Sequence, residues 1–130
     1  MEITIEGEIF LLDISSIQPS QFYISESKLE KIGNWAAFGS IKIPVVLING
    51  LYAATDGHTR LKWAQMAGYT NVQVYIDIDD LSNYIPHFVN EARKRGIYNV
   101  ADMPIISEAD YAEKWHKYCS DFFDNANKKL

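Results

Sequence analysis

The chain has 130 residues, which suits one domain with a substantial core and leaves little room for a second. Its 12 basic and 17 acidic residues give a net charge of −5 with no offsetting basic run, which argues against a nucleic-acid partner. Cys119 is the single cysteine, which excludes an intramolecular disulfide and a cysteine metal cluster.

The N-terminal residues show no basic segment followed by an apolar one, so they do not resemble a secretory signal. No stretch approaches the length of a membrane-spanning helix. We therefore expect a soluble, cytoplasmic protein without a membrane partner.

The first half of the chain predicts strands and a helix separated by turn signals. Residues 2–12 are rich in isoleucine, leucine and phenylalanine, which predicts a strand or a short strand pair before a loop. Ser25 can cap a helix over residues 26–36. Residues 43–48 form an apolar run typical of a buried strand, with Pro44 at its first position or its edge.

The Asn-Gly dipeptide at positions 49–50 is the strongest hairpin signal of the sequence. It predicts that residues 51–55 return as the partner strand. Residues 60–67 then predict a helix that ends at a glycine, and the alternation over residues 72–76 predicts a further strand.

The last third of the chain predicts two helices. Apolar residues from Leu81 onward mark the first, which Gly96 ends. Ser107 and Asp110 resemble a capping box at the start of the second. An aromatic stripe follows on that helix: Tyr111, Trp115, Tyr118 and Phe122. We expect both helices, at about 81–125, to pack onto the sheet of a core at about 9–80, in a single domain spanning 1–130.

The turn over residues 55–60, Thr-Asp-Gly-His-Thr-Arg, carries the most chemistry. A helix N-terminus offers unpaired N–H groups and positive potential, and Gly57 lets a ligand approach the backbone. His58, Thr59 and Arg60 add side-chain donors, so the turn predicts an anion site of the kind that holds nucleotide phosphates. The residues alone leave an alternative open, in which Asp56 only caps the helix and Arg60 is a surface charge.

Residues 53–61, Ala-Ala-Thr-Asp-Gly-His-Thr-Arg-Leu, resemble the phosphate-binding box of the ParB/sulfiredoxin superfamily. In that superfamily a strand leads into Gly-x-x-Arg or Gly-x-His-Arg at a helix start. Residues 17–20 resemble its upstream box and residues 44–46 its middle strand. The resemblance extends over residues 9–80. It implies an α/β (α+β) fold with a small mixed sheet flanked by helices, here followed by a C-terminal helical extension.

Within the superfamily, the box is most similar to that of the free-serine kinases, which transfer phosphate from ATP or ADP to serine. Their Asp-Gly-His-x-Arg pattern matches Asp56, Gly57, His58 and Arg60. Sulfiredoxins carry a catalytic cysteine beside their His-Arg pair, whereas Cys119 lies far away in this chain. Partition ParB proteins bind CTP through an Arg-rich box and add a helix-turn-helix domain, for which this acidic chain has neither the arginines nor the length.

The kinase resemblance implies a role for each residue of the turn. Asp56 and His58 would be catalytic. Gly57, His58, Thr59 and Arg60 would hold the nucleotide phosphates. Asp56 would also hold the Mg²⁺ that accompanies ATP or ADP.

The upstream box supplies the other side of the implied site. Ser20, Gln21 and Tyr23 would line a pocket for a small hydroxylated metabolite. Gln21 stands where the kinases carry a glutamate, and an amide cannot accept the substrate's proton. The alternative function is therefore a non-catalytic nucleotide-binding sensor or interaction module. A DNA-binding partition protein is disfavoured by the charge.

Three acidic residues, Asp77, Asp79 and Asp80, follow the strand over residues 72–76. They could hold Mg²⁺, which prefers carboxylate and water oxygens. The alternative, a solvated turn that caps the next helix, fits the same residues better.

Overall fold

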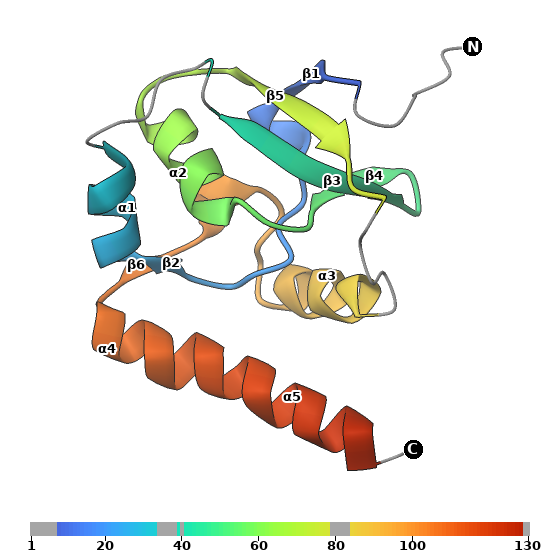
Figure 1. Ribbon diagram of the computed structural model, residues 1–130, viewed down its shortest axis with the longest axis vertical. Coiled ribbons are helices and arrows are strands. Elements are labelled where there is room, and N and C mark those ends of the chain that lie inside the picture. Colours follow the sequence, from blue (N-terminus) through green and yellow to red (C-terminus); the bar gives the residue numbers. More distant parts are fainter. Residues whose placement is uncertain (1–7, 34–38, 40, 79–83, 129–130) are drawn as a thin grey trace.

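The fold contains a four-stranded mixed sheet, which lies at the upper right in Figure 1 with the helices to its left and below it. The computed structural model describes residues 8–33, 39, 41–78 and 84–128. The middle strands run parallel to each other, and each edge strand is antiparallel to its neighbour. The spatial order is β1 (Phe10–Asp13), β5 (Asn71–Ile76), β3 (Lys42–Ile48) and β4 (Leu51–Ala54).

Helices flank this sheet, and two short strands form a separate parallel pair. The first three helices are α1 (Glu26–Gly33), α2 (His58–Met66) and α3 (Ile85–Lys94). The short pair is β2 (Ile24–Ser25) with β6 (Ile105–Ile106). A long C-terminal helix runs through α4 (Glu108–Tyr111), the π-helical turn η4 (Ala112–His116) and α5 (Lys117–Lys128). Two 3-10 turns are η1 (Ile14–Ser16) and η3 (Val100–Asp102).

This arrangement confirms the expected mixed α+β class, with a small sheet, flanking helices and a C-terminal helical extension. The sequence-based bounds partly fall outside the described residues. This applies to the strand start over residues 2–7, the helix end at residues 34–36 and Leu81. No helix in the described ranges combines the length and the apolar character needed to cross a bilayer.

The predicted hairpin is confirmed at β3 and β4. Asn49 and Gly50 have φ values of 49° and 83°, and Ile48 pairs directly with Leu51. Both turn residues therefore occupy the left-handed region that a two-residue hairpin turn requires.

Pro44 corrects the expectation that it lies at the first position or edge of its strand. It is the third residue of β3, a central strand, where it pairs with Tyr75 of β5. Its carbonyl accepts from the Thr55 N–H at 3.0 Å, just beyond the end of β4. A residue's N–H and C=O point to the same side of a strand, so the Pro44 nitrogen, which carries no hydrogen, also faces this side. Because β4 has already ended there, the missing N–H costs the sheet no ladder hydrogen bond to β4.

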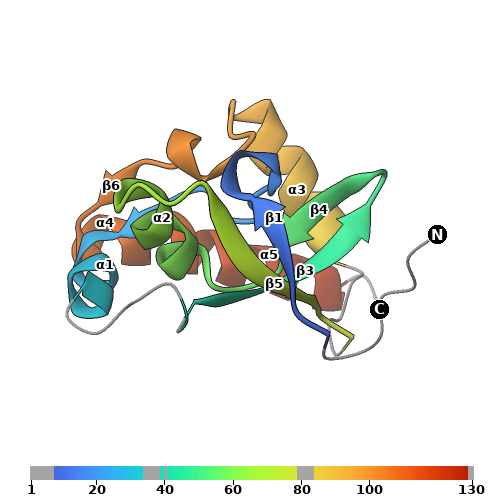
Figure 2. The ribbon, with the colours of Figure 1, turned by 90° about the horizontal axis from the view of Figure 1, so that it is seen from above.

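The sheet is curled, and the segment that follows β1 connects its two edge strands. Phe10 and Tyr52 belong to opposite edge strands, yet their ring centroids lie 5.7 Å apart. After β1 the chain returns to the far edge, where the Gln18 N–H donates to the Tyr52 carbonyl and the Gln18 carbonyl accepts from Ala54, both at 2.9 Å. Strands β1 and β4 are thus joined by one short segment, and the strands twist strongly against each other (Figure 2).

The C-terminal helix does not lie on the sheet, which corrects the expectation from its aromatic stripe. It packs instead against Phe22 and α3, with ring centroids 5.0 Å apart for Phe22 and Trp115 and 5.1 Å apart for Phe88 and Phe122 (Figure 1). Trp115 is 8% exposed and belongs to the hydrophobic core. The stripe is therefore a core surface, as the helical spacing predicts.

The buried Gln18 amide generates a stability prediction. Its Nε2 donates to the Ile97 carbonyl at 2.9 Å, and its Oε1 accepts from Arg93 at 2.9 Å. Gln18→Leu should lower the free energy of unfolding by about 1–3 kcal/mol, because buried carbonyl groups lose their donor. Urea denaturation measures this loss. Arg93→Met removes the outer bond and the contact of the guanidinium with the Tyr98 ring, 4.8 Å from its centroid, and should cost less because both groups it leaves are nearer to solvent. A Gln18→Leu variant as stable as the wild type would contradict the assignment.

Candidate functional site

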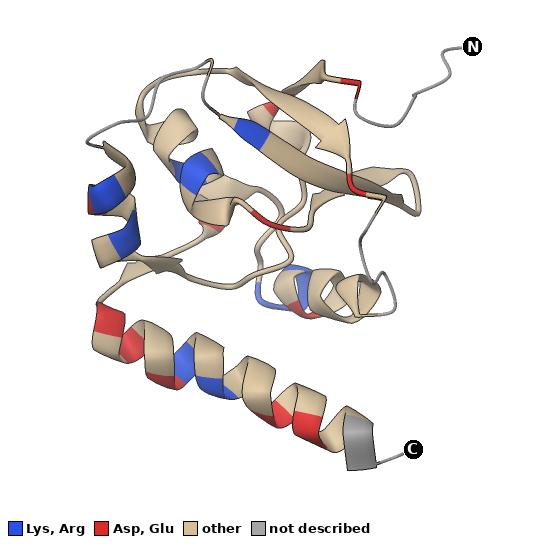
Figure 3. Ribbon diagram, viewed as in Figure 1, with Lys and Arg blue, Asp and Glu red and all other residues tan. Residues whose placement is uncertain are grey.

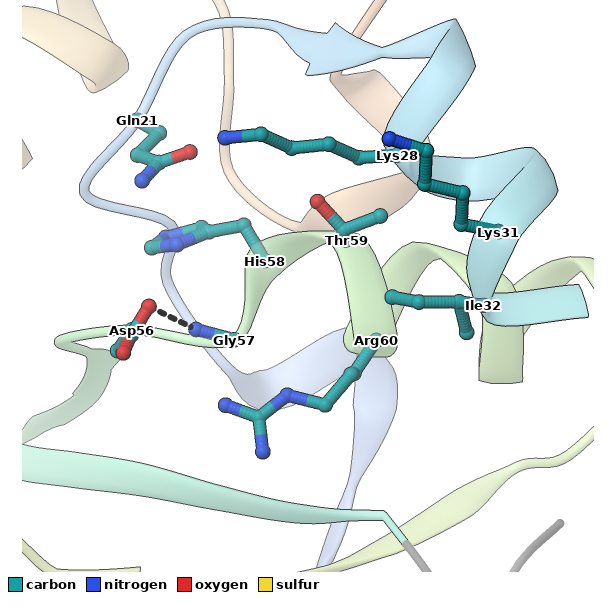
Figure 4. Close-up of a pocket in the computed structure, with 9 residues that line it drawn as sticks. All are labelled: Gln21, Lys28, Lys31, Ile32, Asp56, Gly57, His58, Thr59 and Arg60. Carbon is teal, nitrogen blue, oxygen red and sulfur yellow. Dashed lines mark hydrogen bonds between the residues drawn. The ribbon is translucent and has the colours of Figure 1, made fainter. Parts of the chain in front are cut away.

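The N-terminus of α2 opens into a pocket (Figure 4). Gly57 is its N-cap residue with φ 76° and ψ 22°, and within the described chain no side chain caps it. The first helical bond runs from the Leu61 N–H to the Gly57 carbonyl at 2.9 Å. The N–H groups of residues 58–60 therefore remain available as donors.

Local contacts fix the turn that leads into α2. The Thr55 hydroxyl donates to Asp77 Oδ2 at 2.7 Å, and Asp56 Oδ1 accepts from the Gly57 N–H at 2.7 Å. Gly57 and not Asp56 holds the N-cap position, and the Asp56 side chain bonds the N–H of that N-cap residue. The exposed Asp56 carboxylate lies at the pocket edge instead (Figure 4).

The pocket has a volume of about 510 Å³ and collects positive charge from two helices. Lys28 and Lys31 come from α1, and Arg60 comes from α2, whereas Asp56 is the single acidic residue of the lining. Figure 3 shows basic residues on α1 and on the neighbouring helix α2, in a chain whose net charge is −5. The described lining residues are Gln21, Lys28, Lys31, Ile32, Asp56, Gly57, His58, Thr59 and Arg60.

Arg60 folds back over the turn. Its Nη1 donates to the Lys42 carbonyl at 3.2 Å. A Cβ atom added to Gly57 would lie 2.7 Å from Arg60 Nη2, and the φ of 76° is itself unfavourable for other residues. Position 57 therefore favours glycine for its backbone conformation, and a Cβ atom there would also displace the Arg60 guanidinium from its present place.

His58 supports the turn from inside. It is 2% exposed, and its Nε2 accepts from the Ser20 N–H at 2.9 Å, so the proton of the neutral ring resides on Nδ1. Nδ1 is buried and has no hydrogen-bond partner among the described residues. Burial lowers the pKa of His58 to about 4; Arg60 acts in the same direction and Asp56 opposes it. The ring is therefore neutral at pH 7.

The three residues predicted from the upstream box, Ser20, Gln21 and Tyr23, lie in different surroundings in the structure. Gln21 lines the pocket. Ser20 is buried, and its hydroxyl donates to the Ala54 carbonyl at 2.7 Å. Tyr23 lines a different hollow of about 270 Å³, together with Arg95. The structure thus brings Gln21 to the predicted turn over residues 56–60, and it does not bring Tyr23 or the Ser20 hydroxyl into this pocket.

Sequence reasoning missed the α1 wall of the pocket. Lys28, Lys31 and Ile32 lie at i, i+3 and i+4, which places them on one face of a helix. That spacing could have marked a common face. Nothing local indicated that the face is turned toward α2, because the approach of the two helices is a tertiary contact.

A magnesium ion fits this pocket only together with phosphates. Among the described residues, no group of three or more His, Cys, Asp or Glu side chains could hold a metal. Asp77 accepts from Thr55, while Asp79 and Asp80 lie outside the described residues. One carboxylate, Asp56, matches a Mg²⁺ site in which substrate phosphates and water supply the remaining oxygens.

The buried His58 generates a pH prediction. Its pKa of about 4 lies below the value of 6.5 expected in the unfolded chain, so the unfolded state binds more protons between these pH values. The contribution of His58 to the free energy of unfolding should be present in full above pH 6.5, and about 3 kcal/mol of it should be lost as the pH drops to 4. His58→Gln should show a shallower decline in urea denaturation across this window. Parallel curves for the two proteins would contradict it.

Comparison with known proteins identifies no family. No protein-family model and no curated protein matches the chain. Among solved structures, the protein Atu1540 from Agrobacterium tumefaciens is similar with a TM-score of 0.46 and 15% identity, over 69% of this chain and 49% of that one. The chain therefore spans about half the length of that protein. The resemblance to the ParB/sulfiredoxin superfamily stays a prediction from the sequence.

Proposed function

We propose that the chain binds the phosphates of a nucleotide such as ATP or ADP in the pocket between α1 and α2. The observation that carries the proposal is the uncapped N-terminus of α2 at Gly57, which faces a lining with three cations and one acid. Backbone N–H groups and helix-dipole potential at such an end favour anions.

The surroundings of the turn support the same ligand. Lys28 and Lys31 lie across from Arg60, so a chain of phosphates could meet cations at both ends (Figure 4). The buried Nδ1–H of His58 is a further donor at the turn that lacks a protein acceptor within the described chain. A volume of about 510 Å³ lies within the range of small-molecule sites. The similarity of the turn to the ParB/sulfiredoxin phosphate box agrees with this proposal.

Arg60→Ala should weaken ADP binding roughly ten- to hundredfold, because a charge-assisted hydrogen bond to phosphate is lost. Lys31→Met should weaken it less, since an exposed lysine loses only a screened attraction. Isothermal titration calorimetry measures both. Lys117→Met is the matched control, because Lys117 pairs with Asp121 on α5, away from the pocket. An Arg60→Ala protein that binds ADP like the wild type would remove Arg60 from the site.

A second candidate function is phosphate transfer to a small hydroxylated metabolite such as serine. The observation that favours it is the exposed Asp56 carboxylate on the lining that also carries the phosphate-binding groups. Asp56 could orient the acceptor hydroxyl, while Arg60 and the helix N-terminus stabilise charge on the transferring group. Mg²⁺ bound to the phosphates would neutralise charge there. If Asp56 holds that ion, it does not orient the hydroxyl at the same time.

Incubation with ATP or ADP, Mg²⁺ and free serine separates transfer from binding. If Asp56 orients the hydroxyl, Asp56→Asn should abolish phosphoserine formation, and Gln21→Ala should retain it at saturating nucleotide. Activity gained in Gln21→Glu would show that the missing carboxylate limits the wild type. Tight nucleotide binding without turnover on serine or related metabolites would leave a nucleotide-binding sensor or interaction module as the function.

A further inference from the structure

The short β2–β6 pair places the C-terminal helix beside the pocket. Ser25 pairs with Ile106, and a helix begins within two residues of each strand end, α1 at Glu26 and α4 at Glu108. Ser107 fixes the start of α4, since its hydroxyl accepts from the Asp110 N–H at 3.2 Å. The first turns of the two helices are therefore neighbours.

Tyr111, in the first turn of α4, touches two residues of the pocket lining. Its hydroxyl donates to Gln21 Oε1 in a long hydrogen bond of 3.5 Å. The Lys28 ammonium lies 5.0 Å from the centroid of its ring, within the range of a cation–π contact. Tyr111 itself is 5% exposed, so it acts from behind the lining.

The contact with Tyr111 decides which end of the Gln21 amide faces the pocket. Figure 4 shows the Gln21 oxygen turned toward Lys28 and the nitrogen turned toward His58 and Asp56. Because the oxygen accepts from Tyr111, the NH₂ group is left to face the pocket as a donor. Burial, followed by Cys119 and Asp56, raises the pKa of Tyr111 to about 12, so the hydroxyl keeps its proton at neutral pH.

We propose that Tyr111 is a positioning residue of this site: it turns the Gln21 amide so that its NH₂ group donates to the bound nucleotide, and it holds the Lys28 ammonium at the pocket. The inference rests on the proposed nucleotide binding and adds the C-terminal helix to that site. It also gives Gln21 a role as a donor to the ligand, where a glutamate would be an acceptor.

Calorimetry with ADP tests the hydrogen bond. Tyr111→Phe keeps the ring and should weaken binding roughly two- to tenfold, because the amide loses its orienting donor. Tyr118→Phe is the matched control on the same helix, since its hydroxyl pairs with His87 Nε2 at 3.0 Å, and should bind like the wild type. Equal affinity of wild type and Tyr111→Phe, with Arg60→Ala still weakened, would overturn this inference and leave the proposed function standing.

A double-mutant cycle separates positioning from a general structural role. In a Gln21→Leu background there is no amide to orient, so Tyr111→Phe should cause little further loss of ADP affinity. Independent, additive losses would show that Tyr111 acts by supporting the fold, and would overturn its action through Gln21.

The ligand-free protein tests the Lys28 contact. The Tyr111 ring should shift the Lys28 ε-CH₂ proton signals upfield in NMR spectra, and Tyr111→Leu should abolish the shift while Tyr111→Phe keeps it. Identical Lys28 signals in wild type and Tyr111→Leu would overturn this contact whatever binds. Failure of the wild type to bind ADP would overturn the proposed function and the donation by Gln21, while the Lys28 signals would still decide the position of the ammonium.

Discussion

The hydrogen bonds of residues 18–20 hold together the parts on which the site depends. Gln18 pairs with β4 and closes the curled sheet, and its side chain reaches the Ile97 carbonyl beyond α3. Two residues later, the Ser20 N–H donates to His58 at the start of α2 and its hydroxyl donates to β4. One extended segment thus links the sheet, the region after α3 and the turn over residues 55–60. It also sets the position of Gln21 at the pocket.

A buried lysine of α2 forms hydrogen bonds with the chain segment over residues 100–103. Lys62 is 7% exposed, and its ammonium donates to the carbonyls of Val100, Ala101 and Met103 at 3.0–3.4 Å. Burial lowers its pKa, and Asp102 opposes that shift. The segment that Lys62 holds continues into β6 and then into α4 with Tyr111. Helix α2 therefore connects, through one buried histidine and one buried lysine, the chain segment that brings Gln21 to the pocket and the segment that leads to Tyr111 behind its lining.

The sequence predicts those features whose causes are local. The Asn49–Gly50 turn, a helix that follows the turn over residues 55–60 and the aromatic stripe follow from turn chemistry and periodicity, and they agree with the structure. The helix itself begins at His58, two residues before the predicted start. Features that depend on contacts between distant segments were missed. The α1 lysines required the docking of α1 on α2, and Pro44 in a central strand required the early end of β4. Tyr23 shows the reverse error: closeness in sequence to Gln21 did not place it in the same pocket.

The amide at position 21 fits an anion-binding pocket better than a carboxylate would. The lining already carries Asp56, and a second negative charge nearby would reduce the attraction that Lys28, Lys31 and Arg60 exert on phosphates. A carboxylate would also accept from Tyr111 without leaving any donor toward the ligand. An amide keeps the contact with Tyr111, leaves the lining with excess positive charge and adds two N–H donors. Compared with the glutamate of the kinase pattern, glutamine at position 21 lacks a proton acceptor, and in the proposed nucleotide site it would favour the retention of phosphates. Glutamine at position 21 is compatible with nucleotide binding, whereas phosphate transfer would need another group to accept the proton of the acceptor hydroxyl. Nucleotide binding is therefore the better supported of the two proposed functions.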